Sequence, residues 1–127
     1  MTDELVLPDM DTHLFHMTNI SNIAVSGIRA AEARFAARAE NIANANSAGY
    51  TALRPEQIST AVGPVVRITR PEKPRPNAQK SENAQPSDVD LAHELAGIIA
   101  VKYDYKAAVK LLRTADELNG ALLDILA

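Results

Sequence analysis

Apolar residues recur every three or four positions through the last forty residues of the chain, from Asp88 to Ala127. This spacing predicts one long amphipathic helix, because positions three, four and seven apart share one side of an α-helix. At 1.5 Å per residue the helix would be roughly 55–60 Å long. It cannot cover its own apolar side, so another part of the chain or another chain must do so. The predicted stripe consists of Leu91, Leu95, Ile98, Val101, Tyr105, Ala108, Leu112, Ala115, Leu122 and Leu126.

A second apolar stripe predicts a helix that begins near Ile20 and runs to about Ala45. Its large residues Ile28, Phe35 and Ile42 are seven apart, as Leu91, Ile98, Tyr105 and Leu112 are in the first stripe, and heptad spacing is typical of paired helices. Alanine fills the rest of the second stripe, which favours a closely packed neighbour. Arg38 falls on the same side and must either extend its charge to solvent or meet an acid.

The segment between the two helices contains turn and strand signals. Gly49 is the predicted C-cap of the first helix, because glycine adopts the left-handed conformation easily. Val62–Thr69 predicts a turn and one strand, with Val66 and Ile68 on one face. Residues 71–87 hold four prolines among polar residues and predict an extended linker. Ser87 or Asp88 is the expected N-cap of the second helix.

Together these signals predict a mainly α fold: an elongated, antiparallel, coiled-coil-like hairpin of two helices with a small extended or β insert. Residues 1–19 are expected to form a flexible arm, since Pro8 interrupts their short apolar patch. Residues 20–49 form the N-terminal helix, 50–87 the insert and proline-rich linker, and 88–127 the C-terminal helix.

Composition narrows the class of protein. Two Phe, three Tyr and no Trp in 127 residues leave little large apolar surface for a globular core. The net charge of −3 does not favour nucleic acid as a partner. No apolar run approaches the roughly 20 residues of a membrane span, so we expect no membrane insertion. Four acids precede the first basic residue, which is the reverse of a cleavable signal peptide.

The candidate chemical groups favour no enzyme. His13 and His16 have a spacing that can hold a metal, but no third ligand lies nearby in the sequence. His93 reads as a surface residue, and the acids Asp88, Asp90 and Glu94 suit the start of a helix. A basic line at Lys102, Lys106, Lys110 and Arg113 is interrupted by acids and favours a solvent-exposed face or salt bridges between subunits. We therefore predict no catalytic residue, no metal site and no cofactor.

The stretch from Asn41 to Tyr50 resembles the bacterial flagellar axial proteins, above all the basal-body rod proteins and their proximal members. Their first helix ends in a pattern like A-N-N-x-A-N-x-x-T-x-G-Y. The positions that match here are Asn41, Asn44, Gly49 and Tyr50. Near the second helix, Asp88-Val89-Asp90-Leu91 resembles the family's N-V-D-L, and Tyr105-Lys106-Ala107 resembles its Y-x-A-N. Asp88 and Ala108 stand where the family has Asn, and the insert is shorter than usual.

The resemblance implies a structural subunit of the flagellar rod, the drive shaft for motility in the periplasm, exported through the type III apparatus without a cleavable signal. Its partners would be other copies of itself, other rod proteins and the membrane-ring or export-gate base. A cytoplasmic helical-hairpin adaptor or export chaperone is the alternative. Assembly would use the helix residues Ile28, Phe35, Ile42, Leu91, Leu95, Ile98, Tyr105, Leu112 and Leu122, with Asn41, Asn44, Gly49, Tyr50 and Asp90 as the family motif.

Overall fold

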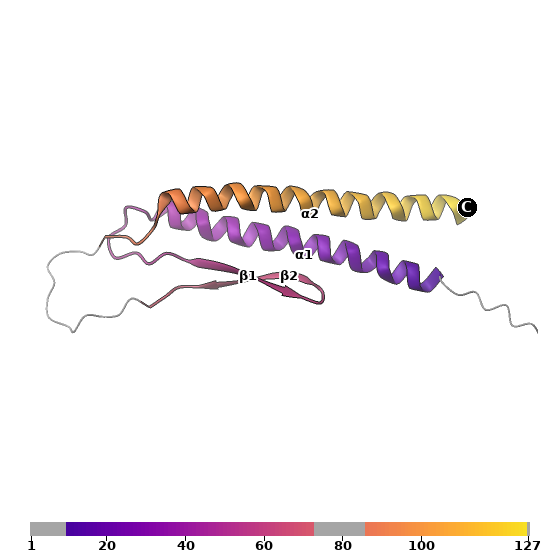
Figure 1. Ribbon diagram of the computed structural model, residues 1–127, viewed down its shortest axis with the longest axis horizontal. Coiled ribbons are helices and arrows are strands. Elements are labelled where there is room, and N and C mark those ends of the chain that lie inside the picture. The colour runs from indigo at the N-terminus through magenta and orange to yellow at the C-terminus, as the bar shows by residue number, and fades with distance from the viewer. Residues whose placement is uncertain (1–9, 73–85, 127) are drawn as a thin grey trace, which may run out of the picture.

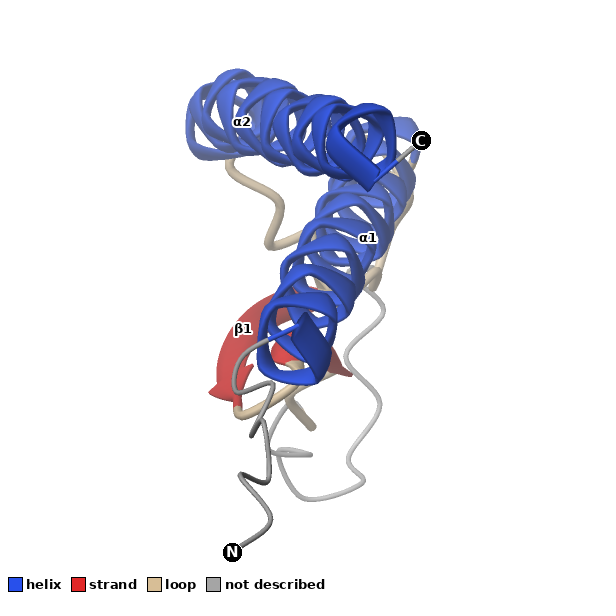
Figure 2. Ribbon diagram, turned by 90° about the vertical axis from the view of Figure 1, so that its right-hand side faces the viewer, coloured by secondary structure: helices blue, strands red, loops and turns tan. Residues whose placement is uncertain are grey.

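The computed structural model describes residues 10–72 and 86–126, with side chains described over 19–72 and 86–125. The chain forms α1 (Met10–Ala43), β1 (Arg54–Thr60), β2 (Gly63–Thr69) and α2 (Leu91–Leu126), in that order. The two helices run antiparallel, and α1 lies between α2 and the two strands (Figures 1 and 2). The helices are closest where α1 ends and α2 begins, and they diverge towards their other ends.

The prediction of a simple two-helix hairpin is wrong, although the fold is mainly α. The two strands pair into an antiparallel sheet with Arg54 opposite Thr69 and Thr60 opposite Gly63, and this sheet packs against α1. The insert is therefore a third layer of the fold. The sequence predicted a turn and one strand in Val62–Thr69, after an extended segment in which Pro55 limits any strand to a short or edge one. Proline is tolerated in β1 because the strand has one unpaired edge.

Small residues form the contact between the two helices. Ala24 and Ala31 of α1, and Val101 and Ala115 of α2, are buried. A Cβ added at Gly27 would lie 3.2 Å from the Cβ of Ala108, so the backbones approach closely at this crossing. The prediction that an alanine-rich side would accept a close neighbour is confirmed.

The tip of the β-hairpin docks on α1 through another glycine. Gly63 has a φ of 113°, and a Cβ there would overlap the Ser26 hydroxyl and lie 3.2 Å from Ile23 Cα. Further along, Ala30 and Ala33 of α1 face β2 residues such as Val66 across a shallow groove. The hairpin thus occupies a different side of α1 from the one that contacts α2.

Three predicted boundaries differ from the structure. Helix α1 begins at Met10 rather than near Ile20, since no proline or glycine interrupts the chain between Pro8 and Gly27. Residues 10–19 are therefore helical, whereas residues 1–9 of the predicted arm lie outside the described residues. Helix α1 ends at Ala43, before the predicted Ala45. Helix α2 begins at Leu91, later than expected.

Candidate assembly surface and the clamp that supports it

Asn41 joins three parts of the chain with one side chain. Its Nδ2 donates to the Leu53 carbonyl at 2.8 Å and to Glu94 Oε1 at 2.9 Å. Its Oδ1 accepts from the Leu53 backbone N–H at 2.7 Å and from the Tyr50 hydroxyl at 3.2 Å. The residue is 0% exposed, and these bonds use both donors and both acceptor positions of the amide. Asn41 therefore holds the lead into β1 and the first turn of α2 against α1.

Glu94 and Arg38 form the second part of this group of contacts. We call the group the clamp: Arg38, Asn41, Tyr50, Leu53 and Glu94. Arg38 Nη1 donates to Glu94 Oε2 at 3.0 Å, and both side chains are largely buried. The guanidinium lies directly against Gly97, where an added Cβ would overlap Arg38 Cζ. A side chain at position 97 would therefore displace the guanidinium. The prediction that Arg38 would extend to solvent or meet an acid is confirmed by its pairing with Glu94.

The residues at the start of the α2 segment form hydrogen bonds in the same corner of the fold, which is the region between the end of α1 and the start of β1. The Ala52 backbone N–H donates to Asp88 Oδ1 at 2.6 Å, and the Asp88 N–H donates to the Tyr50 carbonyl at 3.3 Å. Asp90 Oδ1 accepts the backbone N–H groups of Ala92 and His93. Asp90 is thus the N-cap of α2, in place of the predicted Ser87 or Asp88.

Tyr50 connects the clamp to the end of the β-hairpin. Its hydroxyl reaches Asn41, while the Arg70 guanidinium lies 5.5 Å from the centre of its ring. Arg70 also donates to Glu40 at 3.2 Å. Burial, and then the nearby Glu40 carboxylate, raises the pKa of the Tyr50 phenol above its usual 10.0. The phenol therefore stays protonated and can keep donating to Asn41 at physiological pH.

The turn after α1 partly matches its prediction. Gly49 has the expected positive φ, 74°. Asn44 Nδ2 donates to the Glu40 carbonyl at 2.9 Å, the same oxygen that accepts the Asn44 backbone N–H at 3.1 Å. However, the helix ends six residues before Gly49, and the glycine closes the following turn instead of capping the helix.

Replacing Gly49 with valine is expected to reduce the free energy of unfolding by about 1–2 kcal/mol, because a β-branched residue adopts a positive φ only with strain. A Cβ at this position meets no atom within 4 Å, so the backbone alone carries the cost. Gly49→Asn is the control and should lose less, since asparagine tolerates this conformation. Urea denaturation followed by circular dichroism measures both. Equal stability of Gly49→Val and the parent protein would contradict the argument.

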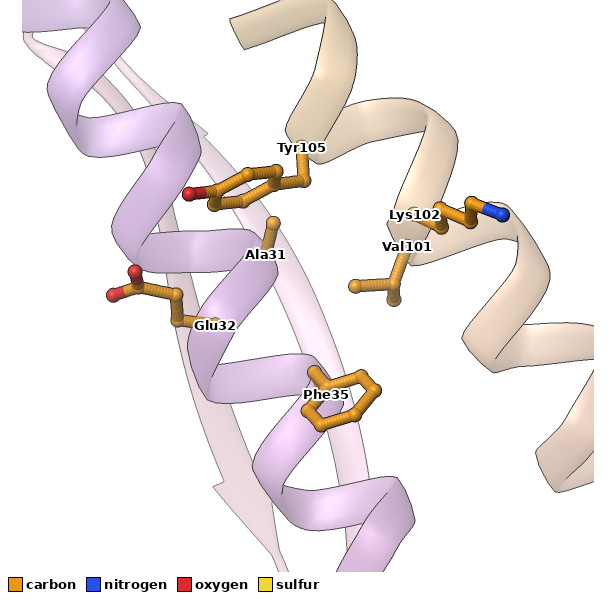
Figure 3. A pocket seen from close by; sticks show the side chains of 6 residues that line it. All are labelled: Ala31, Glu32, Phe35, Val101, Lys102 and Tyr105. Atoms are coloured by element: carbon orange, nitrogen blue, oxygen red, sulfur yellow. The ribbon is translucent and has the colours of Figure 1, made fainter. Parts of the chain in front are cut away.

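An apolar groove runs along one flank of the helix pair. Phe35 and Ala31 of α1 face Val101 and Tyr105 of α2 across a space of about 350 Å³ (Figure 3). Glu32 and Lys102 stand at its polar margins. Phe35 is 51% exposed, which means that the neighbouring helix leaves half of this ring uncovered.

The predicted assembly residues extend this groove into a band. Residues seven apart share one side of a helix, so Ile28 and Ile42 lie on the flank of Phe35. For the same reason Leu91, Ile98 and Leu112 lie on the flank of Tyr105. Each is half-buried or exposed in the single chain, as are Leu95 and Leu122. We call this surface the apolar band: Ile28, Phe35, Ile42, Leu91, Leu95, Ile98, Tyr105 and Leu112.

The remaining candidate groups form no metal site in the part of the chain that the structure describes. No three His, Cys, Asp or Glu side chains there are placed to hold a metal. His93 is exposed, and the side chains of His13 and His16 lie outside the described residues. Among the described side chains, the basic line from Lys102 to Arg113 makes no ion pair. No described helix has the length and apolar character needed to span a membrane.

Comparison of the sequence with models of known protein families and with curated proteins finds no match.

Sequence reasoning missed the central roles of two polar residues. From the sequence alone, Asn41 is only part of a motif and Glu94 is only an acid at a helix start. One signal was available: Glu94 lies among Leu91, Leu95 and Ile98, on the side of the helix predicted to be covered. A carboxylate in that position needs a buried cation, and Arg38 was the cation left without a partner.

Proposed function

We propose that this protein is a structural subunit that assembles through its two helices, and that it serves in the flagellar basal-body rod, as its resemblance to rod proteins suggests. The observation that carries the proposal is the apolar band. A single chain leaves Phe35, Leu91, Leu95 and Tyr105 more than two-fifths exposed. Large exposed apolar side chains that share one flank are characteristic of protein interaction sites.

The arrangement of the motif residues supports the same proposal. Tyr50 bonds to Asn41, and Asp90 caps the helix α2, whose Glu94 accepts a hydrogen bond from the same Asn41. This corner fixes the start of α2 on α1 and hence the shape of the band. The motif therefore has a physical task in this chain, which is to hold two long helices rigidly enough to present an assembly surface.

In the proposed role, the subunit would leave the cell interior through the type III apparatus and join the periplasmic rod. Its neighbours would be copies of itself and other rod proteins. The band would bury against those neighbours, and the β-hairpin would remain on the other side of α1. No catalytic chemistry is required.

Phe35→Ala tests the proposal, because it should damage assembly far more than folding. The ring is half exposed, so its loss should cost the single chain only about 1–2 kcal/mol, below the 3–5 kcal/mol of a fully buried ring. In cells that lack the native protein, the variant should fail to restore swimming and should be missing from purified basal bodies. The parent protein, carrying the same tag, should restore swimming and be found in the rod.

Val62→Ala is the matched control, since Val62 is 70% exposed on the β-hairpin and lies outside the band. It should support normal swimming. If the tagged parent protein stays in the cytoplasm in complex with another flagellar component, the adaptor or export-chaperone function replaces this proposal. Normal rods containing Phe35→Ala would show that the band is not the assembly surface.

A further inference from the structure

Helix α2 carries two exposed leucines, which we call the projection, and an apolar groove, which we call the hollow. They lie on the same flank, the same number of residues before and after Ile98. The projection is formed by Leu91 and Leu95, which are 46% and 54% exposed. The hollow is the apolar groove at Val101 and Tyr105. Leu91 and Tyr105 are each seven residues from Ile98, and Leu95 and Val101 are each three.

We propose that the apolar band binds a second copy of this chain, with the two α2 helices antiparallel about a two-fold axis at Ile98. The axis places Leu91 of each copy opposite Tyr105 of the other, and Leu95 opposite Val101. Each projection then enters the partner's groove, beside Phe35. A surface that carries both a projection and its complement in this way forms a closed, isologous pair.

The charges along α2 favour this direction over a parallel one. Asp90 and Lys106 are each eight residues from Ile98, so the antiparallel pair brings the acidic start of one helix to the basic line of the other. A parallel pair in register would instead place Lys102, Lys106 and Lys110 beside their own copies. Like charges at such distances oppose association, whereas complementary charges fix the register. These lysines have no ion-pair partner among the described residues of the single chain, so they are free to meet an acid.

The pair does not depend on the proposed function. Because it closes on itself, it covers the band without leading to a polymer, and it would compete with any assembly that uses the same surface. A rod subunit would then exist as a dimer before incorporation. A protein with another role would still dimerise.

Cysteine cross-linking of the full chain tests the geometry, and the natural sequence contains no cysteine. With a short bis-maleimide, Ile98→Cys should cross-link to itself, because the axis brings the two copies of residue 98 together. Leu91→Cys and Tyr105→Cys should each remain monomeric alone but cross-link when mixed. Self-linking of both Leu91→Cys and Tyr105→Cys would overturn the antiparallel arrangement in favour of a parallel one. If Ile98→Cys proves unfolded by circular dichroism, mixing Leu95→Cys with Lys102→Cys gives an equivalent test.

Sedimentation equilibrium tests the interface independently. Leu95→Glu should raise the dimer dissociation constant by about 10- to 100-fold, since the pair buries this side chain twice. Leu118→Glu is the control and should leave the constant unchanged, because Leu118 is similarly exposed, at 45%, but lies beyond the predicted overlap. A parent protein that remains monomeric at all concentrations and yields no cross-links would overturn the inference. Such a result would leave the rod function open, since its test is incorporation into basal bodies.

Discussion

Asn41→Leu is expected to lower the free energy of unfolding by about 3–5 kcal/mol, although leucine has nearly the same shape as asparagine. The substitution leaves the Leu53 N–H and carbonyl without their partner. It also removes a donor from the buried Glu94 carboxylate. Each buried polar group left without a bond costs about 1–3 kcal/mol, and the groups lost here belong to one network. Since small domains are stable by only about 5–15 kcal/mol, much of the fold's stability depends on this amide.

Urea denaturation followed by far-ultraviolet circular dichroism measures the loss. Asn44→Ala provides the control, because Asn44 belongs to the same motif but makes its bond to Glu40 at an exposed position. We expect it to cost less than about 1 kcal/mol. A stable Asn41→Leu protein would mean that water or another side chain can satisfy the corner, and the motif would then have no structural role in this chain.

The effect of Gly97→Ala on the free energy of unfolding should change sign when Arg38 is replaced by alanine. In the parent protein we expect a net loss of about 1–3 kcal/mol, because the new Cβ pushes the Arg38 guanidinium away from Glu94 and breaking a buried pair is costly. In an Arg38→Ala background the space is empty. Alanine should then stabilise the protein by about 0.5–1 kcal/mol, since it favours helix over glycine by this amount.

A double-mutant cycle on these two positions gives the coupling free energy directly. Gly120→Ala is the control for helix propensity, because Gly120 lies in α2 with no atom within 4 Å of an added Cβ. It should stabilise both backgrounds equally. A Gly97→Ala effect of the same sign in both backgrounds would show that Arg38 moves aside without losing Glu94.

The heptad pattern placed the large apolar residues on the correct side of each helix, but the fold predicted from it was incomplete. Seven-residue spacing identified which residues share one side of each helix, and Phe35 and Tyr105 do meet at one groove. The pattern also indicated that the two helices pair. Gly27 and Ala108 also approach each other closely, because small residues allow the helix axes to approach, and Phe35 and Tyr105 are left along the flank.

The sequence by itself determined the two long helices, the positive φ of Gly49 and the need of Arg38 for solvent or an acid. These features follow from periodicity, glycine's conformational freedom and the cost of a charge on an apolar side, all of which are local. Only the tertiary structure decided that the β-hairpin forms a third layer and that Asn41 and Glu94 are buried. Burying either residue is favourable only once its partner is in place, and Asn41 and Glu94 are 53 residues apart in the chain. No local pattern can indicate such a pairing, because asparagine and glutamate are ordinarily surface residues until a specific partner satisfies them.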